Sequence, residues 1–113
     1  MTGSNAITMD GQIVNIDCTG NRVGCIGFGP KKVIVVVGAN KIVADAAEGI
    51  KRAKSVAPMK SKRIHHNNPC DETCRCEDCT GEMRVCNVIS IIDGCYKFPG
   101  RISVVVVGEE LGF

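Results

Sequence analysis

Apolar residues along this chain fall into short runs of β-branched side chains and one stretch with helical spacing. The runs at 32–37 and 102–107 are continuous, which is typical of strands buried on both faces of a parallel sheet. An Asp-Gly turn separates two shorter runs and predicts a hairpin. The whole pattern predicts strands at 6–8, 13–16, 23–28, 32–37, 88–92 and 102–107.

The helical stretch forms one apolar face, which consists of Ile42, Val43, Ala46, Ala47, Ile50 and Ala53. Asn40 is a suitable capping residue, and Pro58 is expected to limit the helix at its far end. Glu48 and Arg52 are spaced to form an ion pair on the exposed face. The order of strand, helix, cysteine-rich insert, strand and strand predicts an α/β fold in a single domain, 1–113.

Cysteine is the residue type that stands out, because the 113 residues include 8 of them. Such density indicates disulfides, a metal site or redox chemistry. The N-terminus lacks the charged-then-apolar pattern of a secretory signal, so we expect a cytoplasmic protein with reduced thiols. The spacing C-x3-C-x-C-x2-C-x6-C in the cysteine-rich segment 65–86 supplies soft ligands suited to an iron–sulfur cluster or zinc. The candidate metal ligands are Cys70, Cys74, Cys76, Cys79 and Cys86.

Two other interpretations of this segment stay open, namely free thiols in a surface loop and disulfides formed in air. Acidic neighbours such as Asp71 and Glu77 raise thiol pKa values and oppose bare thiolates unless a bound cation neutralises them. His65 and His66 either complete a zinc site or are solvated loop residues. The other cysteines, Cys18, Cys25 and Cys95, lie near predicted strands and are expected to be small buried residues.

Charge and aromatic content narrow the range of partners. The net charge is +2, from 14 basic and 12 acidic residues, and aromatic residues make up 4% of the chain. This balance does not indicate nucleic-acid binding, and a base-stacking platform needs more aromatic rings. The longest apolar run has five residues, whereas a membrane span needs about 20. We therefore expect neither a nucleic-acid partner nor a membrane span.

Polar loops beside the predicted strands are candidates for anion binding. Backbone N–H groups in such loops bind anions in α/β folds, and an arginine can hold a carboxylate or a phosphate. The candidate ligand-binding residues are Asn5, Asp17, Asn21 and Arg22, with Arg22 holding the anion and Asp17 available as a base. A basic run within 51–63 either binds a phosphate, an acidic partner or a nucleotide tail, or forms a solvated helix end. No residue pattern assigns a catalytic nucleophile.

Several blocks of sequence carry a family resemblance. They include Thr2-Gly3-Ser4-Asn5-Ala6-Ile7-Thr8, Gly20-Asn21-Arg22-Val23, Asn40-Lys41-Ile42-Val43, Arg84-Val85-Cys86 and Gly108-Glu109-Glu110-Leu111-Gly112. Together they resemble the LUD domain of lactate-utilisation proteins, formerly called DUF162, over nearly the whole chain. The blocks correspond to the C-terminal part of that domain, so the chain is similar to a truncated or short version of it.

The resemblance implies a fold, a context and partners. The fold would be an open, mostly parallel sheet of the NagB/RpiA/CoA-transferase-like type, partial here and interrupted by the cysteine-rich loop insert. The wider family works with iron–sulfur partner subunits in the oxidation of L-lactate to pyruvate, and small cysteine-containing members resemble accessory subunits. A partial sheet exposes an edge, so we also expect a homo-oligomer.

Three functional hypotheses follow. The first is a metal-binding accessory subunit linked to L-lactate oxidation, which is not catalytic alone. The second is a carboxylate- or phosphate-binding domain, or an enzyme of the CoA-transferase or sugar-phosphate isomerase class. The third is a plain dimeric interaction module.

Overall fold

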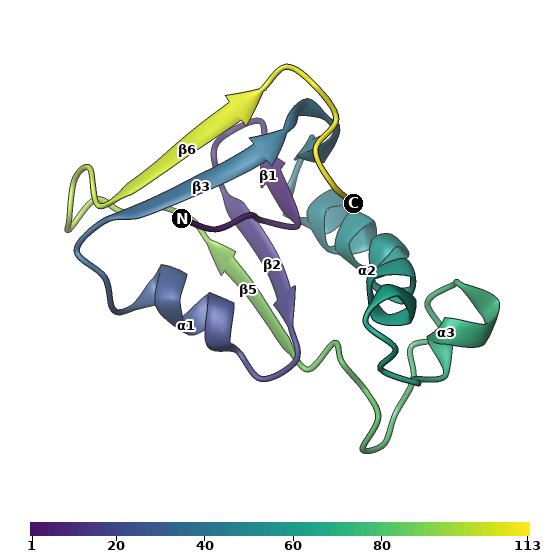
Figure 1. Ribbon diagram of the computed structural model, residues 1–113. Helices are drawn as coiled ribbons and strands as arrows, with labels where there is room; N and C mark the ends of the chain where they lie inside the picture. The colour runs from purple at the N-terminus through teal and green to yellow at the C-terminus, as the bar shows by residue number, and fades with distance from the viewer.

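The computed structural model describes residues 1–113, and it confirms the α/β class. Six strands, three α-helices and one short 3-10 helix follow one another along the chain (Figure 1). In chain order they are β1 (Ala6–Thr8), β2 (Ile13–Asp17), α1 (Asn21–Gly27), β3 (Val33–Gly38), η1 (Ala39–Lys41), β4 (Ile42–Val43), α2 (Ala46–Arg63), α3 (Cys70–Thr73), β5 (Val88–Ile92) and β6 (Ile102–Val107). None of these helices combines the length and the apolar character that crossing a membrane requires.

The strands form two sheets, which corrects the expectation of one open, mostly parallel sheet. The larger sheet has the order β4-β1-β2-β5, in which β4 runs parallel to β1, while the pairs β1-β2 and β2-β5 are antiparallel. The smaller sheet is the parallel pair β3-β6. The predicted hairpin is confirmed as β1-β2, and its short turn brings antiparallel neighbours into the larger sheet.

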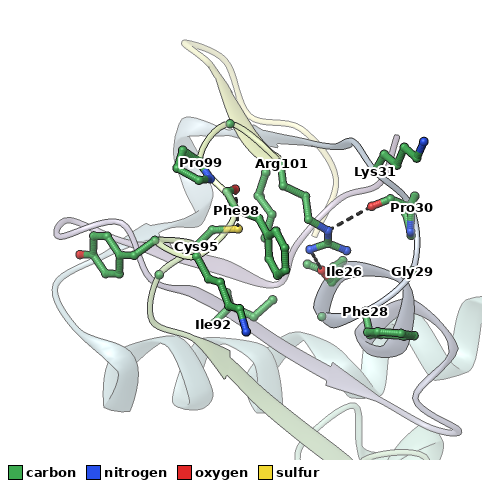
Figure 2. A pocket seen from close by; sticks show the side chains of 16 residues that line it. Ile26, Phe28, Gly29, Pro30, Lys31, Ile92, Cys95, Phe98, Pro99 and Arg101 are labelled. Carbon is green, nitrogen blue, oxygen red and sulfur yellow. Dashed lines mark hydrogen bonds between the residues drawn. The ribbon is translucent and has the colours of Figure 1, made fainter.

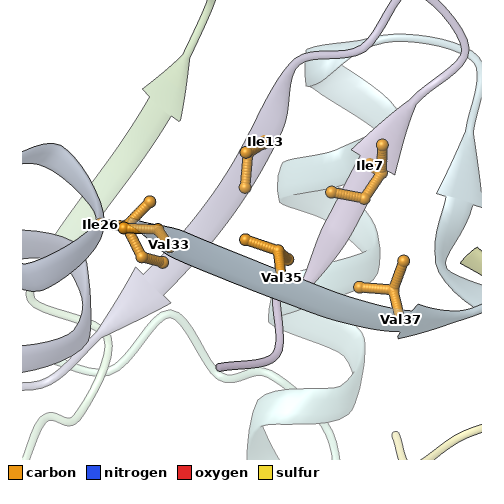
Figure 3. Packing of buried hydrophobic residues seen from close by; sticks show 6 residues of the cluster. All are labelled: Ile7, Ile13, Ile26, Val33, Val35 and Val37. Atoms are coloured by element: carbon orange, nitrogen blue, oxygen red, sulfur yellow. The ribbon is translucent and has the colours of Figure 1, made fainter. Parts of the chain in front are cut away.

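The core lies between the two sheets. Val33, Val35 and Val37 of β3 face Ile7 and Ile13 of the larger sheet, and Ile26 of α1 closes one end of this cluster (Figure 3). On the opposite face of the larger sheet, α2 packs against β1 and β2 (Figure 1). The close approach there depends on Gly49, because a Cβ at this position would lie 2.8 Å from Cγ2 of Val14.

Burial of the long apolar strands is more one-sided than the sequence predicts. In β3 the three core valines are buried, whereas Ile34 and Val36 are half-buried. In β6 the side chains of Val104, Val105 and Val106 are all exposed. The outer face of the β3-β6 pair has no covering helix, so continuous β-branched sequence here does not mean burial on both faces.

Three local predictions are wrong, each for a physical reason. Residues 23–28 belong mostly to a helix, α1, rather than a strand, and the Asp17 carboxylate at the end of β2 accepts from the Val23 backbone N–H in its first turn at 2.8 Å. The long helix begins after Asp45, whose side chain accepts from the Glu48 backbone N–H at 2.9 Å, and not at Asn40. It also continues through Pro58 to Arg63, because packing against the sheet outweighs the hydrogen bond that proline removes.

The predicted ion pair between Glu48 and Arg52 is also replaced. Glu48 pairs with Lys51 at 3.6 Å. The guanidinium of Arg52 instead donates to the backbone oxygens of Asn40 at 3.0 Å and Asn5 at 2.7 Å. Arg52 therefore ties α2 to the loops that precede β1 and β4.

Candidate functional site

Three of the predicted ligand-binding residues meet at the C-terminal end of β2. Arg22 lies in the first turn of α1, and its Nη2 atom lies 2.7 Å from Asp17 Oδ1. The same Nη2 donates to Asn5 Oδ1 at 2.6 Å and to the Ile16 carbonyl at 2.9 Å. The other Asp17 oxygen accepts from the Val23 backbone N–H at 2.8 Å. The chain turn between β2 and α1 is thus held by one arginine, one carboxylate and one amide.

A cavity of about 290 Å³ opens beside this cluster. Its walls come from the end of β2, from the C-terminal half of α2 and from the cysteine-rich segment. The residues that line it are Asn5, Ile16, Asp17, Cys18, Arg22, Ala53, Ala57, Lys60, Ser61, Ile64, His66, Val85 and Cys86. We call this space the β2 cavity.

Positive charge dominates the surroundings of the β2 cavity. Burial first of all, and then the nearby charges of Lys41, Arg22 and Arg52, lower the pKa of Lys60 to about 8, against the opposing carboxylate of Asp17. Four cations therefore act around one carboxylate. Such a concentration of like charge is unfavourable in the empty cavity and favours the binding of an anion.

Lys41 is the most deeply placed of these cations. The residue is 8% exposed, and it lies outside the lining of the β2 cavity. Burial lowers the pKa of Lys41, and the charges of Arg52 and Arg22 lower it further.

Asn21, the fourth predicted ligand-binding residue, lies outside the β2 cavity. Its side chain is exposed and lines a separate space with Met1, Cys25 and Lys32, which Arg22 also borders. Lys60 belongs to the basic run within 51–63, but sequence analysis did not assign it to this site, because the helix was expected to end at Pro58. The five further residues of α2 place Lys60 on the cavity wall.

The cysteine-rich segment covers the C-terminal half of α2 and brings several thiols near one another. Cys70 is buried at the start of α3. Burial raises the pKa of Cys79, and a hydrogen bond with the Cys70 thiol raises it further. Burial also raises the pKa of Cys86, followed by the charges of Cys76, Cys70 and Cys79. No three Cys, His, Asp or Glu side chains are arranged closely enough to surround one ion.

Cys74 and the two histidines lie apart from these thiols. The Sγ atom of Cys74 accepts from Lys62 Nζ at 3.5 Å. His66 lines the β2 cavity, whereas His65 is exposed. The expectation that Cys18, Cys25 and Cys95 are buried is wrong, since Cys25 is exposed and the other two are half-buried.

A larger cavity of about 700 Å³ lies at the end of the β3-β6 sheet where both strands begin (Figure 2). It is bounded by the loop after α1 and by the loop between β5 and β6. Arg101 crosses between these loops, donating to the carbonyls of Ile26 at 2.8 Å and Pro30 at 3.0 Å (Figure 2). Both of these guanidinium hydrogen bonds go to backbone carbonyls of the chain itself. None of the predicted site residues lines this cavity.

Comparisons with known proteins identify one similarity. A family model described as the LUD domain matches residues 1–107. Neither the curated proteins nor the solved structures include a match to this chain.

Proposed function

Because this chain belongs to the LUD domain family, which is associated with lactate-utilisation proteins, we propose that its β2 cavity binds a small carboxylate anion. The observation that carries this proposal is that two cations, Arg22 and Lys60, line the β2 cavity beside the single carboxylate of Asp17, with the charges of Lys41 and Arg52 acting on Lys60 from nearby. Charge of this density in a partly enclosed space is compensated most directly by a ligand of opposite sign.

The hydrogen bonds of the site show which groups are free to hold the ligand. Arg22 uses Nε and Nη2 for Asp17, Asn5 and the Ile16 carbonyl. Its Nη1 group has no partner in the chain, and neither has Lys60 Nζ. We therefore assign the direct contacts with a carboxylate to Arg22 Nη1 and Lys60 Nζ, which are both donors suited to charge-assisted hydrogen bonds. Asp17 orients Arg22.

The size of the β2 cavity restricts the ligand class. A volume of about 290 Å³ is at the small end of the range for ligand cavities, which is roughly 300–1,000 Å³. It suits a carboxylate of a few carbon atoms better than a nucleotide or a coenzyme. In the lactate-utilisation context the chain would bind such a carboxylate as an accessory subunit, while partner subunits carry the electrons.

Isothermal titration calorimetry at low ionic strength tests the proposal, with L-lactate, pyruvate and inorganic phosphate as separate ligands. We expect a carboxylate to bind more tightly than phosphate. Lys60→Met should weaken that binding about tenfold, equivalent to about 1.4 kcal/mol. Lys51→Met is the matched control, because Lys51 is on the same helix with its side chain 79% exposed.

Two results would contradict the proposal. One is the absence of measurable binding of any of the three anions to the wild-type chain. The other is unchanged binding in both Lys60→Met and Arg22→Ala. Tighter binding of phosphate than of either carboxylate would keep the cavity as an anion site but overturn the assigned ligand class.

A further inference from the structure

We propose that the cavity of about 700 Å³ where β3 and β6 begin binds a planar aromatic anion of the nucleotide type, a base with an attached phosphate. This cavity shares no lining residue with the β2 cavity. The inference is therefore independent of the proposed function. It rests on the aromatic rings and the positive charges that the fold gathers around one space.

Nearly all aromatic side chains of the chain line this one cavity. The sequence contains three Phe, one Tyr and no Trp, and of these Phe28, Tyr96 and Phe98 belong to the lining, while Phe113 does not. So few rings argue against binding of a nucleic-acid strand, whose successive bases stack on a series of rings. A single base needs only one or two partners, so the gathering of three rings is sufficient for a mononucleotide.

These three rings are open to solvent and are not part of the core. Phe28 and Tyr96 are each 90% exposed, and Phe98 is 60% exposed. Phe28 belongs to the loop after α1 and Phe98 to the loop between β5 and β6, so each wall of the cavity supplies a ring (Figure 2). Exposed apolar groups that cluster on one surface mark a place of ligand or partner contact.

Positive charge without an opposing carboxylate accompanies the rings. Lys31, Lys97 and Arg101 line the cavity, and no Asp or Glu does. None of these three cations forms an ion pair within the chain. Asp93 is the nearest acidic residue along the chain, but it lies outside the lining and accepts from Gln12 Nε2 at 2.5 Å. The cavity is thus complementary in charge to an anion.

One ring and one cation lie side by side, as a base and its phosphate require. Lys97 Nζ lies 5.9 Å from the centre of the Phe98 ring. A base that stacks on Phe98 would carry its phosphate within reach of the Lys97 ammonium. Lysine binds phosphate as a compact point charge, and its flexible stem adapts to the position of the group.

Arg101 gives the cavity a fixed frame. It directly precedes β6, and its guanidinium donates to the carbonyls of Ile26 at 2.8 Å and Pro30 at 3.0 Å (Figure 2). These bonds join the start of β6 to the loop after α1, so both walls are held together before a ligand arrives. A site that is ordered in advance binds with a smaller entropic cost.

The volume separates this cavity from the β2 cavity in ligand class. About 700 Å³ lies well within the range for ligand cavities, which is roughly 300–1,000 Å³. It is more than twice the volume of about 290 Å³ of the β2 cavity. A nucleoside monophosphate fits this space, whereas a small carboxylate would leave the exposed rings uncovered.

Isothermal titration calorimetry of the full chain with adenosine 5′-monophosphate (AMP) tests the proposal, with adenosine and ribose 5-phosphate as its two halves. We expect AMP to bind about tenfold more tightly than either half, because only AMP uses both the rings and the cations. Phe98→Leu and Lys97→Met should each weaken AMP binding about tenfold. Phe113→Leu and Lys51→Met remove a ring and a cation outside the cavity and should leave the affinity unchanged.

A second measurement uses the unaltered chain and so does not depend on the folding of any variant. In the proton NMR spectrum, AMP should shift the ring resonances of Phe28, Tyr96 and Phe98 and leave those of Phe113 in place. Lys60→Met should leave AMP binding unchanged, although it weakens carboxylate binding in the β2 cavity, so the two proposals fail separately.

Three results would overturn the proposal. The first is the absence of AMP binding to the wild-type chain, which would leave the exposed rings for contact with another protein. The second is binding of AMP without any shift of the three ring systems that line the cavity. The third is binding of adenosine or of ribose 5-phosphate as tight as that of AMP, because a nucleotide site uses both halves of its ligand.

Discussion

Lys60 is the residue whose ionisation links the β2 cavity to pH. Its pKa is lowered to about 8 by burial, first of all, and then by the neighbouring cations. A bound carboxylate stabilises the charged form, so the pKa of Lys60 rises when the ligand binds. Binding therefore takes up a proton above about pH 8. We expect the affinity for the carboxylate to be level below about pH 7.5 and to fall as pH rises through 8 and 9, measured by calorimetric titration at each pH.

The control for this pH dependence is Lys60→Met, whose weaker affinity should lack the fall near pH 8. His66, Cys18 and Cys86 also line the cavity. Without ligand, the pH dependence of the free energy of unfolding has the opposite sign to that of the affinity. Since the folded pKa lies below the unfolded value of 10.5, the contribution of Lys60 to stability improves as pH rises from about 8 to 10.5.

Residue-level prediction from sequence succeeded where a local motif sufficed. The loops before β1 and after β2 pointed to Asn5, Asp17 and Arg22, and the structure brings these three together. Sequence analysis did not connect Lys41 or Lys60 with these residues, although Lys60 belongs to the predicted basic run within 51–63, because the placement of both lysines depends on the bounds of helices. Lys41 lies in a 3-10 turn rather than at a helix start, and Lys60 lies beyond Pro58 in a helix that continues.

At the scale of elements, Gly49 controls how closely α2 approaches the sheet. A Cβ at this position would meet Cγ2 of Val14 at 2.8 Å, against a buried strand that cannot move easily. We expect Gly49→Ala to destabilise the protein by about 1–3 kcal/mol, which is the usual cost of overpacking. Chemical denaturation followed by circular dichroism measures this free energy of unfolding.

Gly24→Ala is the matched control for this substitution. Gly24 also lies within a helix, α1, but a Cβ there would meet nothing within 4 Å. Alanine is the better helix former, so we expect this variant to be unchanged or more stable by about 0.4–1 kcal/mol. Equal destabilisation of both variants would show that the loss at Gly49 does not come from contact with Val14.

The elements themselves were predicted unevenly. Strand runs of β-branched residues identified β3, β5 and β6, and the Asp-Gly turn identified the hairpin. The segment around Gly24 and Gly27 was misassigned, because tertiary packing of Ile26 and the contacts of Asp17 override its weak helical propensity. The pairing of β4 with β1 joins residues 42–43 to 7–8. No local sequence pattern predicts a contact between segments so far apart in the chain.

At the scale of the whole molecule, two sheets rather than one pack over a shared core. The sequence contained no signal for this division, because strand pairing over long separations depends on the packed three-dimensional arrangement. The α/β class is confirmed, whereas the NagB/RpiA/CoA-transferase-like type and the assignment to the C-terminal part of a LUD domain stay predictions. The division leaves β5 and β6 at sheet edges, each with one strand neighbour.

The β6 edge is the surface on which we expect a second copy to pair. Val104, Val105 and Val106 are 37–51% exposed, and the strand contains neither charge nor proline. An edge of this kind presents free backbone groups with nothing to prevent strand pairing. Its lack of charge also removes repulsion when the strand meets its own copy. Sedimentation velocity at micromolar concentration should therefore show a dimer of the wild-type chain.

Val105→Lys should convert that dimer to a monomer, because a lysine on an edge strand opposes the approach of a second strand. Val105 is 46% exposed, so the substitution costs the fold little. Met9→Lys adds the same charge at an 81% exposed position in the β1-β2 turn and should remain dimeric. A monomeric wild-type chain would refute self-association. A dimer that persists in Val105→Lys would place the contact elsewhere, because pairing through β6 would bring the like charges of the two introduced lysines close together.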